Sequence, residues 1–227
     1  MASFSSIRLM HDDASVDLCN DTLPHSFCWT RFGSEAGETI EAILARKETE
    51  RQANSGVFYW GVGNSIAAAI AELLDVVDHP EVLFSPIKSR PRRVDVAPER
   101  IVRWASAQGL TGETFDLPPH ASVTSRWNPL RPATAHYALV CMTNEPLEIT
   151  NSARLHFGAL RNLRTGAPLG ASQVTAVVHR GEMSRDDGAY PVAFRASLVP
   201  PYFIRLRQPE SVDERDGSAV QCAQLRF

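Results

Sequence analysis

The clearest pattern in this chain is Gly56-Val57-Phe58-Tyr59-Trp60-Gly61-Val62-Gly63-Asn64-Ser65-Ile66, followed by Ala67-Ala68-Ala69-Ile70-Ala71-Glu72-Leu73-Leu74. It predicts a buried aromatic strand at 57–62, a glycine turn, and a helix over about 65–77 whose first turn begins at Asn64 or Ser65. Such a junction brings free backbone N–H groups, a small polar side chain and the edge of a Trp ring close together. The sequence therefore predicts one wall of a cleft here.

The glycines of this junction do not complete a nucleotide-binding motif. The third glycine of G-x-G-x-x-G would stand at Ile66, no parallel βαβ pattern follows, and no Gly-Lys-Ser/Thr occurs in the chain. What remains is a side-chain cap from Asn64 or Ser65 and a helix N-terminus able to hold an anion or a carbonyl group. The alternative is a cap that serves only the fold.

Two further elements are predicted before the junction. Residues 26–32 alternate between apolar and polar side chains, which indicates a strand with Phe27, Trp29 and Arg31 on one face. Residues 34–52 predict a helix with apolar residues at helical spacing. Its outer, solvent-facing side is predicted to carry Glu41, Lys47, Glu48, Glu50 and Arg51.

After residue 80 the chain reads mainly as strands. One begins over 81–87, where Pro86 predicts an edge position or a bulge, and residues 106–120 have the composition of a loop. Further strands are predicted at 123–127, 137–142, 153–157, 172–179, 191–198 and 202–206. Helices in the N-terminal third followed by strands favour a mixed α+β fold, with a partly closed, β-barrel-like sheet, over a doubly wound parallel sheet.

The predicted domain organisation is simple. Residues 1–24 are an irregular N-terminal segment, 25–208 a single domain with a candidate subdivision near 145, and 209–227 a polar C-terminal tail.

Composition limits the functional classes. The net charge is −3 and the pI about 6.2, which argues against a protein that binds duplex DNA through a broad basic surface. The four cysteines are far apart, so we expect buried, reduced thiols and a cytoplasmic location. No apolar run has the length of a membrane span, and we expect no membrane partner. The oligomeric state is left open.

Metal chemistry has no support in the spacing of the seven histidines, and we expect no metal and no cofactor. The segment His120-Ala121-Ser122-Val123-Thr124-Ser125-Arg126-Trp127 predicts a strand with His120, Ser122, Thr124 and Arg126 on one face. One functional hypothesis is therefore a metal-independent small-molecule enzyme. In it His120 is the general acid or base near Arg126, and Gly63-Asn64-Ser65 bind an anionic or carbonyl group. The alternative is a solvated strand edge.

Residues 26–105 resemble the opening of the PUA-like superfamily, especially its EVE and ASCH branches. The matching features are an aromatic first strand at Phe27-Cys28-Trp29, a helix, and a Gly followed by a hydrophobic strand at 56–60. The fourth matching feature is a strand that leads into a turn of Ser, Pro and basic residues, Phe84-Ser85-Pro86-Ile87-Lys88-Ser89-Arg90-Pro91. The resemblance implies a small pseudo-barrel whose cleft binds nucleic acid, in some members a modified or flipped base.

On this hypothesis the chain is a binding module for nucleic acid or a nucleobase-like ligand. Trp29 and Trp60 would stack on a base, while Asn64, Ser65 and Ser89 would form hydrogen bonds with it. Phosphates would be held by Lys88, Arg90, Arg92 and Arg93. Separately, the segment 159–173 is rich in small and amide residues, so Gln173 is a further candidate ligand contact.

Overall fold

The structure is a computed structural model that describes residues 23–34, 38–87, 100–125, 136–150, 153–170, 172–183 and 188–213. Its elements, in chain order, are β1 (Ser26–Phe32), α1 (Ile40–Ala53), β2 (Val57–Val62), the short 3-10 helix η3 (Asn64–Ile66), α2 (Ala67–Val76), β3 (Glu81–Pro86), β4 (Arg100–Gly109), β5 (Thr114–Asp116), β6 (Ser122–Ser125), β7 (His136–Met142), β8 (Ala153–His156), the short 3-10 helix η4 (Phe157–Ala159), β9 (Leu160–Asn162), β10 (Thr175–Arg180), β11 (Ala189–Val192) and β12 (Phe194–Asp213).

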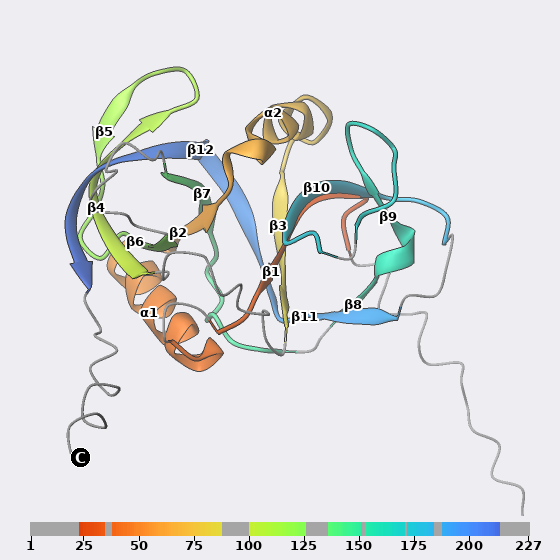
Figure 1. The fold of residues 1–227 in the computed structure, drawn as a ribbon, viewed down its shortest axis with the longest axis horizontal. Coiled ribbons are helices and arrows are strands. Elements are labelled where there is room, and N and C mark those ends of the chain that lie inside the picture. The colour runs from red at the N-terminus through yellow and green to blue at the C-terminus, as the bar shows by residue number, and fades with distance from the viewer. Residues whose placement is uncertain are drawn as a thin grey trace, which may run out of the picture.

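The fold is mixed α+β, as predicted, and is mostly sheet with two α-helices among the described residues (Figure 1). The main sheet has the order β2-β7-β12-β3-β1-β10-β9, and β4, β5 and β6 continue from the long strand β12. Strand β12, from after residue 145, lies between β7 and β3, which both come before it in the chain. Within the described residues no pairing joins β2 to β6 or to β9, so the sheet is open and not a closed barrel.

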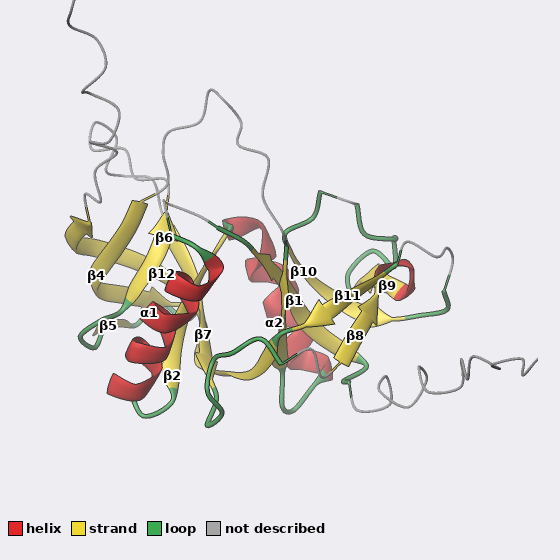
Figure 2. Ribbon diagram, turned by 90° about the horizontal axis from the view of Figure 1, so that it is seen from below, coloured by secondary structure: helices red, strands yellow, loops and turns green. Residues whose placement is uncertain are grey.

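Three apolar clusters fill the space between the layers. The first lies between the sheet and the two helices and contains Trp60, Ile70 and Phe84. The second lies where β8 and β11 cover β1, β3 and β10, and contains Trp29 and Phe157. The third is enclosed where β4, β5 and β6 fold back over β2, β7 and β12. Figure 2 shows this division, with α1 beside β2 and β6 and the β8–β11 pair at the other side of the molecule.

Strand β7 shows how the sheet is covered on both sides. Its run Tyr137–Met142 is apolar without alternation, which predicted a strand buried on both faces. Leu139 and Cys141 belong to the first cluster, while Ala138 and Val140 belong to the third. The prediction is confirmed.

Some local predictions were wrong. Residues 106–120 are not a loop throughout, because β4 continues to Gly109 and pairs with β5 in a hairpin. Pro86, by contrast, does have an edge position: β3 lies between β1 and β12, but β12 pairs only with residues 81–84, so Pro86 at the end of β3 is paired with β1 alone. The separate strands predicted at 191–198 and 202–206 both overlap the single strand β12, which shifts its register on β7 between Leu198 and Phe203.

The junction from β2 to α2 also differs in detail. Helical structure starts at Asn64 as predicted, but in the 3-10 form. The capping residue is Gly63, and neither Asn64 nor Ser65 provides a side-chain cap to the following helix. Both side chains are exposed.

Candidate functional site

The ends of β1 and β3 carry a cluster of aromatic and polar side chains. Arg31, the penultimate residue of β1, lies with its guanidinium carbon 5.2 Å from the ring centre of Tyr190 and 5.9 Å from that of Trp29. The parallel register places Arg31 opposite Ser85 of β3. We call Trp29, Arg31, Ser85, Gln173 and Tyr190 the Arg31 cluster.

Trp29 is the buried base of the Arg31 cluster. Its side chain is 0% exposed, and its indole N–H donates a 3.0 Å hydrogen bond to the hydroxyl of Ser85. Phe157 and Tyr190 pack against it with ring centres 5.7 Å and 6.1 Å away. Trp29 therefore offers no ring face to a ligand, in contrast to the stacking role expected from the sequence, and the half-buried ring of the cluster is that of Tyr190.

Gln173, two residues before the start of β10, also contacts Arg31. Its backbone carbonyl accepts a hydrogen bond of 3.4 Å from Nη1 of Arg31, and its exposed side-chain amide donates to the carbonyl of Thr175. The hydroxyls of Thr30 and Thr175, 2.9 Å apart, join the neighbouring strands. Two predicted ligand residues, Trp29 and Gln173, are thus brought together around Arg31.

The basic segment follows directly from this end of the sheet. Ile87 donates a 2.7 Å backbone hydrogen bond to Phe32, so β1 and β3 end side by side. In the sequence the next residues are the predicted phosphate contacts and Ser89. Lys88, Ser89, Arg90, Arg92 and Arg93 all lie outside the described residues.

The other predicted site residues lie elsewhere. Trp60 is 8% exposed and packs in the first apolar cluster against Phe32, Phe84 and Phe194, so it too presents no free ring face. Asn64 and Ser65 are exposed beyond the end of β2, which is separated from β1 in the sheet by β7, β12 and β3. The predicted cleft wall of Trp60 and Asn64 is therefore not part of the Arg31 cluster.

His120 does not share a strand face with Ser122. It is an exposed residue with φ of 73° in the turn before β6, whereas Ser122 is the buried first residue of that strand. Arg126 lies outside the described residues, and so does Trp127.

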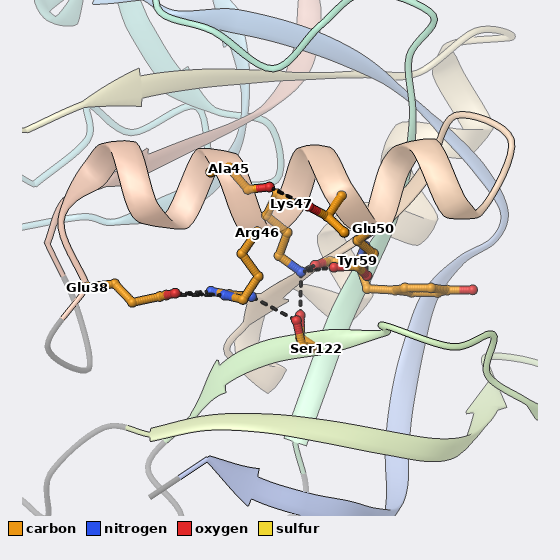
Figure 3. Close-up of polar contacts among 8 residues, drawn as sticks. Glu38, Ala45, Arg46, Lys47, Glu50, Tyr59 and Ser122 are labelled. Carbon is orange, nitrogen blue, oxygen red and sulfur yellow. Dashed lines mark hydrogen bonds and ion pairs between the residues drawn. The ribbon is translucent and has the colours of Figure 1, made fainter. Parts of the chain in front are cut away.

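A buried ionic network lies between α1 and two strands (Figure 3). Nζ of Lys47 lies 2.6 Å from Oε2 of Glu50 and also donates to the backbone carbonyls of Tyr59 in β2 and Ser122 in β6. Oε1 of Glu50 accepts a 3.0 Å hydrogen bond from the backbone N–H of Tyr59. The two side chains thus satisfy backbone groups of β2 and β6, which do not pair with each other.

This network corrects the prediction for the outer face of α1. Lys47 is 2% exposed and Glu50 is 0% exposed, although both were expected to face solvent. Desolvation lowers the pKa of Lys47 to about 8 and raises the pKa of Glu50. Helical periodicity gives no signal for this, because the burial depends on β6, far away in the sequence.

A second ion pair extends the network toward the start of α1. Arg46 contacts the buried carboxylate of Glu38 at 2.8 Å and donates a further 2.8 Å hydrogen bond to the hydroxyl of Ser122. Ser122 is therefore bound twice by α1, through its carbonyl and through its side chain. The arrangement ties the helix to β6, and Glu38, Lys47 and Glu50 of the network are all buried.

No metal site is found in the part of the chain that the structure describes, where no group of three or more His, Cys, Asp or Glu side chains comes together. Cys28 and Cys141 are buried thiols, as expected, and burial raises the pKa of both, that of Cys28 to about 12. Cys19 and Cys222 lie outside the described ranges. Among the helices described, none is long and apolar enough to cross a membrane.

Comparison of the chain with protein-family models, with curated proteins and with solved structures found no match. The assignment of a function therefore depends on the geometry of the chain itself.

Proposed function

We propose that the chain is a nucleic-acid-binding module that holds a base, unmodified or modified, at the Arg31 cluster. The observation that carries the proposal is the guanidinium of Arg31, 5.2 Å from the half-buried ring of Tyr190. A guanidinium plane and a Tyr ring are both surfaces on which nucleobases stack in single-stranded or flipped-out form. The exposed amide of Gln173 supplies a donor and an acceptor for the edge of such a base.

Phosphate binding belongs to the basic segment in this proposal. Lys88, Arg90, Arg92 and Arg93 follow in the sequence from the strand end beside Arg31. Such a local basic segment is compatible with the acidic pI, because affinity depends on the number of phosphates contacted and not on the net charge alone.

Trp29 has a supporting role in this proposal. Trp29 fixes Ser85 through its indole N–H and carries Arg31 above its ring. In the proposal it positions the guanidinium and does not itself contact the base.

The proposal keeps the resemblance to the PUA-like superfamily as its finer form. In that form the part of the sheet made of β2, β7, β12, β4 and β6 corresponds to the pseudo-barrel. Lys47 and Glu50 of α1 lie between β2 and β6, which do not pair with each other. Support for it comes from the short motifs between 26 and 91 and from the position of Arg31 beside the Ser/Pro end of β3.

Fluorescence anisotropy with labelled oligonucleotides of about twelve nucleotides tests the proposal. Single-stranded, duplex and base-methylated oligonucleotides are compared at about 50 mM and about 200 mM salt. We expect binding that weakens with salt, and we expect Tyr190→Leu to lower affinity by about 1–3 kcal/mol while Tyr190→Phe, which keeps the ring, binds as the wild type. Arg31→Gln should lower affinity as well.

The matched control is Arg164→Gln. Arg164 is an exposed arginine paired with Glu72 of α2 and lies outside the cluster. Equal losses in the Arg31 and Arg164 variants would indicate a nonspecific charge effect. Absence of binding to every oligonucleotide at low salt would reject the proposed function.

A further inference from the structure

A row of side chains crosses five strands on the side of the sheet where β2 leads into α2. The registers place Val62 opposite Tyr137, Tyr137 opposite Arg205, Arg205 opposite Gln108, and Gln108 opposite Thr114. Residues paired in this way share one face of a sheet and are neighbours in space. Figure 1 shows this end of the sheet at the top, between α2 and the β4–β5 hairpin.

Tyr137, the second residue of the row, provides a flat aromatic surface. Its ring is stacked on Phe203, with ring centres 5.4 Å apart and planes at 19°. Phe203 is buried in the first apolar cluster, whereas Tyr137 is half-buried at its border. The ring is therefore held in one orientation by the core and remains partly accessible.

Two exposed arginines stand beside this ring. Arg205 and Arg207 alternate along β12, so they lie on the same face, roughly 7 Å apart along the strand. Arg207 donates to the side-chain carbonyl of Gln108, whose amide in turn donates 3.0 Å to the carbonyl of Gly112 in the hairpin. Gln108 is thus a positioning residue that fixes the direction of Arg207.

The carboxylates near this surface do not neutralise it. Asp116 lies in the row of Arg207, beyond Ser106, and Glu113 is engaged by Thr111 in the hairpin turn. Within the described ranges, no ion pair joins a carboxylate to Arg205 or Arg207. Two positive charges therefore face solvent next to a fixed aromatic ring.

From this geometry we propose a second binding surface, formed by Tyr137, Arg205 and Arg207, whose ligand is a single-stranded nucleic acid segment. A base stacks on Tyr137, and the adjacent phosphates contact the two guanidinium groups. A duplex fits poorly, because its bases are stacked on one another and their faces are not available to the ring of Tyr137. An acidic peptide would meet the charge requirement but gains nothing from the ring.

This inference does not rest on the Arg31 cluster. That cluster lies at the ends of β1 and β3, whereas this surface lies at the opposite ends of the strands, where β2 leads into α2 (Figure 1). The two surfaces can therefore be removed separately by substitution.

The test uses the full chain and a labelled poly-dT oligonucleotide of about six nucleotides, too short for a single strand to extend far beyond one site. We expect Tyr137→Leu, which keeps apolar packing against Phe203, to lower affinity roughly 5- to 150-fold. We expect the double variant Arg205→Gln/Arg207→Gln to reduce the slope of log K against log[salt] by about 1.4, as for two lost phosphate contacts. Arg164→Gln is the control, and circular dichroism verifies the fold of each variant.

The outcomes separate the inference from the proposed function. If the Tyr137 and Arg205/Arg207 variants bind like the wild type while the Arg31 variant is weakened, the second surface is rejected and the proposed function stands. The reverse pattern supports the second surface and rejects the Arg31 cluster. Equal competition by duplex DNA or by an acidic peptide, or no binding at all, overturns the inference.

Discussion

Lys47 and Glu50 are buried together because each satisfies more than the charge of the other. Lys47 donates to two backbone carbonyls besides the carboxylate, and Glu50 accepts the backbone N–H of Tyr59. A buried ion pair of this kind adds little net stability compared with apolar residues, but removal of one partner leaves an uncompensated buried charge. Single substitutions at this pair should therefore be far more harmful than the pair's net contribution suggests.

We expect Lys47→Met to lower the free energy of unfolding by about 3–5 kcal/mol at pH 7. The double variant Lys47→Met/Glu50→Leu should be no less stable than Lys47→Met, because it removes the unpaired carboxylate. Urea denaturation followed by circular dichroism measures both. Additive losses in the double variant would contradict this account of the pair.

The loss in Lys47→Met should depend on pH. Burial already raises the pKa of Glu50, and removal of the ammonium group should raise that pKa further. Between the unfolded pKa near 4.5 and the raised folded pKa, the folded state binds more protons than the unfolded state, so stability falls as pH rises. Lys47→Met should therefore approach the wild type at about pH 5 and fall behind it at about pH 7. A pH-independent difference would be the contrary result.

At the scale of the element, α1 connects two strands that do not pair. The helix is capped by Thr39, whose hydroxyl accepts a 3.3 Å hydrogen bond from the N–H of Ala42. The first turns also place Arg46 against Glu38 and Ser122. The start of the helix is therefore coupled to β6.

Thr39→Ala should cost about 0.5–2 kcal/mol, as for the loss of an N-cap. Because α1 holds Ser122, amide hydrogen exchange should increase in the first turn of α1 and also in β6. Thr39→Ser, which keeps the hydroxyl, is the matched control. An increase confined to α1 would show that the helix start and β6 are independent.

The elements differ in how well the sequence predicts them. β1 and β2 agree with their predicted ranges, because their alternation or aromatic run is a local pattern. The loop predicted at 106–120 overlaps the end of β4 and all of β5, because Gly109 and Gly112 indicate a turn, whereas the strands there depend on pairing with β12 and with each other. The burial of Lys47 likewise depends on Ser122, which no helical periodicity can indicate.

The candidate site was predictable only in part, for the same reason. The resemblance to the PUA-like superfamily indicates Trp29, local composition indicates Gln173, and the structure brings both to Arg31. Tyr190 gave no signal in the sequence, because its contact with Arg31 depends on β11 covering the main sheet. The aromatic character of Trp60 suggests a stacking residue, but its ring packs in the first apolar cluster.

At the scale of the whole molecule, the two proposed binding surfaces lie at opposite ends of the sheet. The Arg31 cluster lies at the ends of β1 and β3, and the surface around Tyr137 lies at the opposite end of the sheet (Figure 1). The acidic net charge keeps nonspecific attraction to nucleic acid low, so binding depends on these local surfaces. The central claim is that a base contacts Tyr190 beside Arg31.

Photo-crosslinking with a single-stranded oligonucleotide that carries 4-thiothymidine, followed by mass spectrometry of the digested protein, tests this claim most directly. We predict that adducts form on the peptide containing Tyr190, that they disappear in Tyr190→Leu and weaken in Arg31→Gln, and that they persist in Arg164→Gln. Adducts that map only to peptides outside the Arg31 cluster, or an unchanged yield in Tyr190→Leu, would contradict the account.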